Sequence, residues 1–191
     1  MCFHYSLTLD AQTIATQIPA TWVQHDWQPI YHADGFTFLQ MPVVTMEAPE
    51  RIQLMHWGLI PSWVQNRDEA EKMRAFTLNA RAETLFEKPS FRDAIRHQRC
   101  LVLADGFFEW MDLKKKKYPH YIYLKQHPLF CFAGIHAAWT DRETGEHIDS
   151  FSIITCNANA TLARIHNLKQ RMPVILAPAQ WHTWLQPELS Q

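Results

Sequence analysis

Residues 100–111, with the sequence CLVLADGFFEWM, decide the fold class that this chain is expected to adopt. Two runs of aliphatic and aromatic residues lie on either side of Asp105-Gly106, a dipeptide typical of tight turns. Such a short link, like the one at residues 141–145, favours an antiparallel hairpin over a β-α-β crossover. Similar composition predicts strands at residues 36–41, 53–59, 100–103, 107–111, 121–124, 129–133, 151–155 and 174–176.

Short helices are predicted between these strands. Residues 9–18 and 67–76 carry apolar side chains at helical spacing. Ser90 and Asp93 form a capping-box pattern before a third helix, and Pro178 stands where a first-turn proline would open a fourth. We therefore expect an α+β fold: a single domain over residues 1–191, with a mostly antiparallel, barrel-like β-sheet and peripheral helices.

Composition and charge narrow the classes of partner. Hydrophobic residues make up 47% of the 191 residues and charged residues 19%, which excludes a disordered chain. Lys and Arg total 18 against 19 Asp and Glu, so a net charge of -1 supplies no global field for a nucleic acid or an anionic membrane. A nucleic-acid partner would need a local basic patch. Without a long apolar run or a signal-peptide pattern, we expect a cytoplasmic monomer with no membrane partner.

The cysteine spacing predicts neither a disulfide framework nor a metal site. No C-x-x-C motif occurs, and Cys2, Cys100, Cys131 and Cys156 are widely separated. We expect reduced thiols, no metal and no cofactor. The last three cysteines sit in apolar runs typical of buried structural thiols, so no chemistry is assigned to them.

Cys2 is the most unusual residue for its position. An initiator Met is commonly removed before a small side chain, which would leave Cys2 with an α-amine of pKa about 8 beside a thiol of pKa about 8.5. This 1,2-aminothiol would condense with an aldehyde, through an imine, to a thiazolidine. Used against an amide, the same atoms would make an N-terminal nucleophile hydrolase. The third interpretation is a cysteine that only fills the core.

Two polar motifs are candidates for a site. In a strand, Asn79, Arg81 and Glu83 would face one side, where Arg81 would bind a phosphate and Asn79 would position a nucleophile. A solvated strand edge is the alternative. Glu109 stands among aromatic residues, which raise a carboxyl pKa toward the range used in acid-base catalysis. The alternative for Glu109 is an exposed position on a strand.

Two further segments carry candidate residues. His166 and Arg171 stand just before an apolar strand, although most of the 11 histidines are expected to be surface or core residues. Trp57 and Trp63 flank a turn, where they would either stack on splayed bases or fill the core.

Together these motifs resemble the SOS-response-associated peptidase (SRAP) family. The resemblance extends from Cys2 to Leu176 and rests on six motifs in one order. They are Met1-Cys2, WGLIPSW at 57–63, NARAE at 79–83, SFR at 90–92 with RCLV at 99–102, ADGFFEW at 104–110, and IH at 165–166 with RMPVIL at 171–176. The family commonly has Gly-Arg after the cysteine, whereas Phe3 and His4 follow it here.

The resemblance implies an abasic-site sensor that binds single-stranded DNA and forms a thiazolidine crosslink through Cys2 once Met1 is removed. Stopping at the imine would give lyase activity, and binding to DNA would place the protein at the nucleoid. The resemblance implies that Asn79 orients the amine, that Glu109 transfers protons and that His166 acts at the sugar. The DNA-contacting residues that it implies are Pro42, Trp57, Trp63, Arg81, Arg171 and Met172.

Two other functions stay open at this point. One is a cysteine peptidase of the N-terminal nucleophile type. In its narrowest form, this peptidase would cleave only its own chain and remove the residues before Cys2. The other is a non-catalytic module that binds single-stranded DNA.

Overall fold

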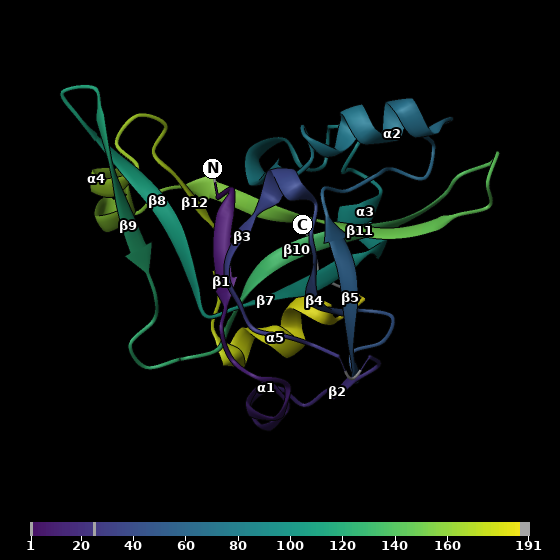
Figure 1. The fold of residues 1–191 in the computed structure, drawn as a ribbon, viewed down its shortest axis with the longest axis horizontal. Helices are drawn as coiled ribbons and strands as arrows, with labels where there is room; N and C mark the ends of the chain where they lie inside the picture. Colours follow the sequence, from purple (N-terminus) through teal and green to yellow (C-terminus); the bar gives the residue numbers. More distant parts are fainter. Residues whose placement is uncertain (1, 25, 188–191) are drawn as a thin grey trace.

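The computed structural model describes residues 2–24 and 26–187 (Figure 1). Its strands are β1 (His4–Leu7), β2 (Thr21–Trp22), β3 (Ile30–Asp34), β4 (Gln40–Thr45), β5 (Arg51–Trp57), β6 (Asn79–Arg81), β7 (Arg99–Ala104), β8 (Gly106–Leu113), β9 (Lys116–Ile122), β10 (Phe130–Thr140), β11 (His147–Asn157), β12 (Arg171–Pro173) and β13 (Ile175–Leu176). Its α-helices are α1 (Ala11–Gln17), α2 (Arg67–Arg74), α3 (Ala94–His97), α4 (Ala160–Ile165) and α5 (Pro178–Leu185), with 3-10 turns η1 (Gly35–Thr37) and η2 (Ala82–Thr84).

Within the described part of the chain, five strands close a barrel. Strands β11, β10, β7, β4 and β5 pair in that order, and β5 pairs back with β11. Every pair is antiparallel except β5 with β11, which is parallel. A ring of five strands cannot alternate direction at every step, so closure requires one parallel pair. The expected α+β fold with a mostly antiparallel, barrel-like sheet and few helices is confirmed.

A second sheet, in the order β3-β1-β8-β9, stands beside the barrel on the left of Figure 1. After β7, the chain leaves the barrel and returns to this second sheet at Asp105. The Asp105 carboxylate accepts hydrogen bonds from the hydroxyls of Ser6 (2.6 Å) and Thr8 (2.5 Å). A Cβ on Gly106 would lie 2.1 Å from the hydroxyl oxygen of Tyr121, so any larger residue would displace the Tyr121 ring. The hairpin predicted at Asp105-Gly106 is wrong: this dipeptide is a corner between two sheets.

Other strand predictions have mixed outcomes. The link at residues 141–145 does join the antiparallel strands β10 and β11. The strand expected at residues 36–41 begins only at Gln40, as β4, because η1 occupies Gly35–Thr37 and Phe38 has a left-handed φ of 54°. Strand β9 begins earlier than expected, inside the lysine tract, since Lys114 and Lys115 form a turn with φ of 51° and 65°.

The helices begin where local capping allows. Asp10 caps α1 and Asn66 caps α2, each through a side-chain oxygen that accepts a backbone N–H. The capping box at Ser90 is wrong, because the Ser90 hydroxyl donates to the sulfur of Met73 and α3 begins only after Asp93. Pro178 is the first residue of α5, as predicted.

The core lies inside the barrel and continues under the second sheet. Tyr5 of β1 packs edge-on against Trp57 of β5 and Phe132 of β10, so aromatic side chains join the two sheets. Cys100 and Cys131 are buried in this core as free thiols. Among the described residues, no helix is both long and apolar enough to cross a membrane.

Candidate active site

Cys2 lies two residues before the start of β1, with its side chain fully buried. Its carbonyl oxygen accepts a hydrogen bond of 2.8 Å from the amide nitrogen of Asn79. Asn79 reaches this point because β6 runs parallel to β11, where Asn79 lies opposite Ile153. Burial, and after it the Glu109 carboxylate, raises the pKa of the Cys2 thiol well above its usual range. The thiol is therefore neutral, and a base is needed before it can attack.

Glu109 and His166 form an acid-base pair at the same end of the second sheet. Glu109 Oε2 lies 3.4 Å from His166 Nδ1, and Glu109 is only 3% exposed. Burial raises the pKa of Glu109 to about 7. Burial also lowers the pKa of His166, so the imidazole is neutral near pH 7. A carboxyl with this pKa holds and releases a proton at neutral pH, as acid-base catalysis requires.

The tautomer of His166 follows from its backbone contact. Nδ1 lies 2.9 Å from the carbonyl oxygen of Arg171, and a carbonyl only accepts. Nδ1 therefore carries the hydrogen, and the neutral ring has its lone pair at Nε2. This places the basic nitrogen of His166 on the side of the ring away from Arg171.

Asn167 attaches the loop that carries His166 to strand β8, which carries Glu109. Its side-chain oxygen accepts the N–H of Asp112 at 3.0 Å, and its amide nitrogen donates to the carbonyl of Asp112 at 2.8 Å. The reciprocal pair fixes the distance between His166 and Glu109. The sequence did not point to Asn167, because a lone asparagine in a loop carries no pattern.

A pocket of about 190 Å³ opens over this pair. Its volume suits a single sugar-sized group rather than a base pair or a folded peptide. The pocket is lined by Phe3, His4, Glu109, Trp110, Lys117, His166, Leu168 and Lys169. The two lysines would attract a phosphate. Among the described residues, no three His, Cys, Asp or Glu side chains converge as metal ligands would.

Two residues expected to contact DNA are inside the protein. Trp57 is 0% exposed and donates its indole N–H to the carbonyl of Leu78 at 2.9 Å. Pro42 is buried on β4. Both expectations are corrected, since neither side chain presents a surface to a ligand.

Arg171 is also turned inward. Its guanidinium donates to both carboxylate oxygens of Glu83, at 2.6 and 2.9 Å, and to the carbonyl of Thr155 at 2.7 Å. The expected DNA contact is corrected, because these donors join β12 to η2. The expectation that Glu83 shares a strand face with Asn79 is wrong as well, since the strand ends at Arg81.

The remaining candidates differ in exposure. Arg81 is exposed at the end of β6, and Trp63 is 44% exposed beside Pro89. Met172 is half-buried and its sulfur lies 3.4 Å from the backbone nitrogen of Asn159, the residue that caps α4. Arg81 and Trp63 are thus available to a partner, while Met172 supports the helix that leads to His166.

These features define the class of the protein: an α+β barrel in which Cys2 lies beside an amide and a buried carboxyl-imidazole pair. The family described as SOS response associated peptidase (SRAP) matches residues 1–191, and the chain belongs to it.

Relatives with similar sequence or structure are found in bacteria and vertebrates. Abasic site processing protein YoqW of Bacillus subtilis is 35% identical over 191 residues, which cover 98% of this chain and 81% of that protein. Abasic site processing protein HMCES of Gallus gallus is 35% identical over 150 residues, covering 68% of this chain and 44% of that protein. A crystal structure of a Bacteroides thetaiotaomicron protein has a TM-score of 0.93 and 42% identity, and the match covers 100% of this chain and 83% of that one.

Proposed function

We propose that this chain processes abasic sites by binding single-stranded DNA and forming a covalent thiazolidine with the exposed sugar aldehyde through Cys2. The observation that carries the proposal is the convergence of Cys2, Asn79, Glu109 and His166 at one end of the second sheet. The naming of YoqW and HMCES as abasic site processing proteins supports the substrate class.

The reaction begins with removal of Met1, which lies outside the described residues. While Met1 is attached, the nitrogen of Cys2 is an amide and is not nucleophilic. Once free, the amine adds to the aldehyde carbon of the opened sugar, and loss of water forms an imine. The sulfur then attacks the imine carbon, and the thiol proton passes to the nitrogen. Aldehyde and aminothiol thus yield a thiazolidine and one water.

The acid-base pair supplies the proton transfers. An abasic sugar is mostly a closed ring, so Glu109 in its protonated form donates to the ring oxygen as the aldehyde forms. As a carboxylate, it next accepts the proton of the Cys2 thiol, whose raised pKa requires such a base. His166 takes up protons at Nε2 and stays neutral between transfers.

Asn79 holds the nucleophile in place. Its hydrogen bond to the Cys2 carbonyl fixes the first peptide unit of the mature chain, which limits the directions in which the amine points. An amine with one orientation attacks faster than one that rotates freely, because less entropy is lost in the transition state.

A crosslinking assay with two matched thiol variants tests the proposal. Protein whose first residue is verified by mass spectrometry as Cys2 is incubated with single-stranded DNA that carries an abasic site or an intact base. We expect a shifted band on a denaturing gel only with the abasic DNA. Cys2→Ala abolishes this band, whereas Cys156→Ala, which removes another thiol that is partly accessible, keeps it. No band from a protein that begins with Cys2 would refute the proposal.

The family description favours a second candidate, a peptidase that uses the same thiol. This activity would act on an amide and would need no aldehyde. Incubation of the full-length chain, with Met1 encoded, would reveal loss of residues before Cys2 by mass spectrometry. Loss that requires the Cys2 thiol supports self-processing, and loss that also occurs in Cys2→Ala assigns the step to a separate aminopeptidase.

A further inference from the structure

A continuous series of aromatic rings crosses one face of the sheet β3-β1-β8-β9. We call it the aromatic track and define it by His4, His32, Phe108, Trp110, Tyr121 and Tyr123. Its ring centroids are 4.8 Å apart for Trp110 and His4, 4.9 Å for His4 and His32, 5.1 Å for His32 and Phe108, 5.0 Å for Phe108 and Tyr121, and 6.0 Å for Tyr121 and Tyr123.

Strand register places these rings on the outer face. Tyr5 lies opposite Phe107, and both side chains are fully buried in the core. Side chains alternate along a strand, so the neighbouring His4 and Phe108 point outward. Phe108 lies opposite Tyr121 on β9, which continues the same face.

Exposure distinguishes the track from the core. Tyr121 is 47% exposed and Tyr123 is 57% exposed, and His32 is exposed as well. Contiguous aromatic surface of this kind marks a binding surface more often than isolated apolar residues do. Inside the protein, the Tyr121 hydroxyl lies 3.0 Å from that of Ser6, which holds its ring flat over Gly106.

We propose that the aromatic track binds the unpaired bases next to the abasic nucleotide by stacking. This inference rests on the proposed function, because the abasic sugar must occupy the pocket at one end of the track. His4 and Trp110 line that pocket, so the track begins where the sugar would be held. Exposed aromatic side chains on a four-stranded sheet stack about two or three bases in other single-strand binding proteins.

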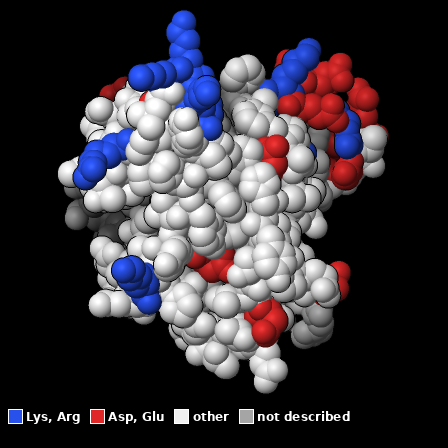
Figure 2. All heavy atoms as spheres, turned by 60° about the vertical axis from the view of Figure 1, so that its left-hand side comes forward, with Lys and Arg blue, Asp and Glu red and all other residues white. Residues whose placement is uncertain are grey.

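Charge at both ends of the track fits a nucleic acid strand. Lys169 lines the catalytic pocket with Lys117, which is ion-paired with Asp112 at 3.3 Å. Lys125 lines a second hollow of about 410 Å³ together with Asp105, Tyr121 and Tyr123. In Figure 2, where the side of the molecule that carries β9 faces forward, a broad, mostly uncharged area has Lys and Arg along its upper and left margins, with Asp and Glu side chains within it and on its right side. Asp34, 4.0 Å from His4, is the acidic side chain that faces the imidazole.

Stacking also fits the residues that follow Cys2. His4, two residues after Cys2, lies parallel to His32, with an interplanar angle of 9°. A chain with a net charge of -1 gains less from phosphate contacts, so base stacking would supply a larger part of its affinity.

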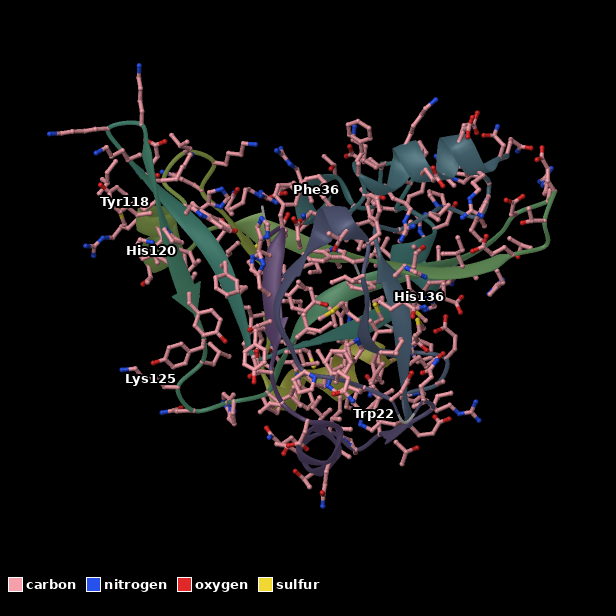
Figure 3. The ribbon with its side chains drawn as sticks, viewed as in Figure 1. Trp22, Phe36, Tyr118, His120, Lys125 and His136 are labelled. Atoms are coloured by element: carbon pink, nitrogen blue, oxygen red, sulfur yellow. The ribbon has the colours of Figure 1, made fainter. Side chains whose placement is uncertain are left out.

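Two double variants of matched composition test the proposal. His32→Ala with Tyr123→Ala removes two rings of the track. His120→Ala with Tyr118→Ala removes the same residue types from the opposite face of β9, where Figure 3 shows both side chains on the outer left. Fluorescence anisotropy measures binding to a single-stranded oligonucleotide with one tetrahydrofuran abasic analogue, flanked either by purines or by further abasic analogues.

Wild-type protein and the control variant should bind the purine-flanked strand more tightly. The track variant should bind it at least about fivefold more weakly than the control and should lose the preference for purines, since each stacked base contributes this much or more. Tyr123→Leu removes a ring but keeps apolar bulk, and it should show part of the same loss if the double variant does not fold.

The outcomes separate this inference from the proposed function. If wild-type protein crosslinks abasic DNA but binds both strands equally, or if the track and control variants bind alike, the aromatic track does not stack bases. If purines matter as expected but no crosslink forms on aldehyde-bearing DNA, the stacking surface stands and the crosslinking function fails.

Discussion

Replacing Glu109 with Gln should make the protein more stable at high pH and nearly inactive. Glutamine keeps the shape and the oxygen that faces His166, but it carries no charge to bury. In the unfolded chain the Glu109 carboxyl has a pKa of 4.5, and in the folded chain burial raises the pKa to about 7. Between these values the folded state binds more protons than the unfolded state, so stability falls as pH rises.

The size of the effect follows from the two values. The gap between 4.5 and about 7 corresponds to about 3 kcal/mol of unfolding free energy, lost in full only above pH 7. Glu109→Gln should therefore match wild type near pH 4, below the unfolded pKa, and exceed it by about 3 kcal/mol near pH 8.5. Its rate of crosslinking should fall by about 10²-fold or more, because the proton transfers are lost.

Urea unfolding from pH 4 to pH 9 measures the difference. Glu87→Gln, the same change at an exposed position, serves as control and should follow wild type at every pH. Parallel curves for wild type and Glu109→Gln across this range would refute a buried carboxyl with a raised pKa. Full crosslinking activity in Glu109→Gln would refute its role in proton transfer.

Three further predictions concern neighbouring residues. Arg171→Met should lower the unfolding free energy by about 2–3 kcal/mol, measured in urea, because it removes the bonds to Glu83 and Thr155, and it should leave DNA affinity unchanged. Asn167→Ala should slow crosslinking in a single-turnover assay without weakening DNA binding, since it releases the His166 loop from Asp112; an unchanged rate would contradict this positioning role. Three phosphate contacts, from Arg81, Lys117 and Lys169, predict that log affinity for single-stranded DNA falls against log salt concentration with a slope of about -2. Replacing both lysines with Gln should reduce this slope to about -0.7. Binding that does not depend on salt would exclude these contacts.

Local sequence predicted most strands and the fold class but missed how the sheets divide. The run around Asp105-Gly106 does form two strands, and they belong to different sheets. The reason is a contact distant in sequence: the Asp105 carboxylate bonds Ser6 and Thr8 at the end of β1. Turn propensity describes only the dipeptide, so it cannot distinguish a hairpin from a corner.

The candidate site was predicted unevenly for a similar reason. Residue chemistry singled out Cys2, Asn79 and Glu109, and the family resemblance added His166. The structure brings these side chains to one end of the second sheet. Residue type does not reveal direction, however: it left Trp57 open between stacking on bases and filling the core, the resemblance implied a DNA contact, and the side chain lies in the core.

By itself, the sequence determined the chemical inventory: an aminothiol at Cys2, strands of strong β propensity, and motifs in the order of a known family. Only the tertiary structure decided which groups meet and which face solvent. The parallel pairing of β6 with β11 brings Asn79 to Cys2, and burial under the second sheet raises the pKa of Glu109. Both effects come from strands far apart in the chain, and no local pattern of residues encodes their pairing.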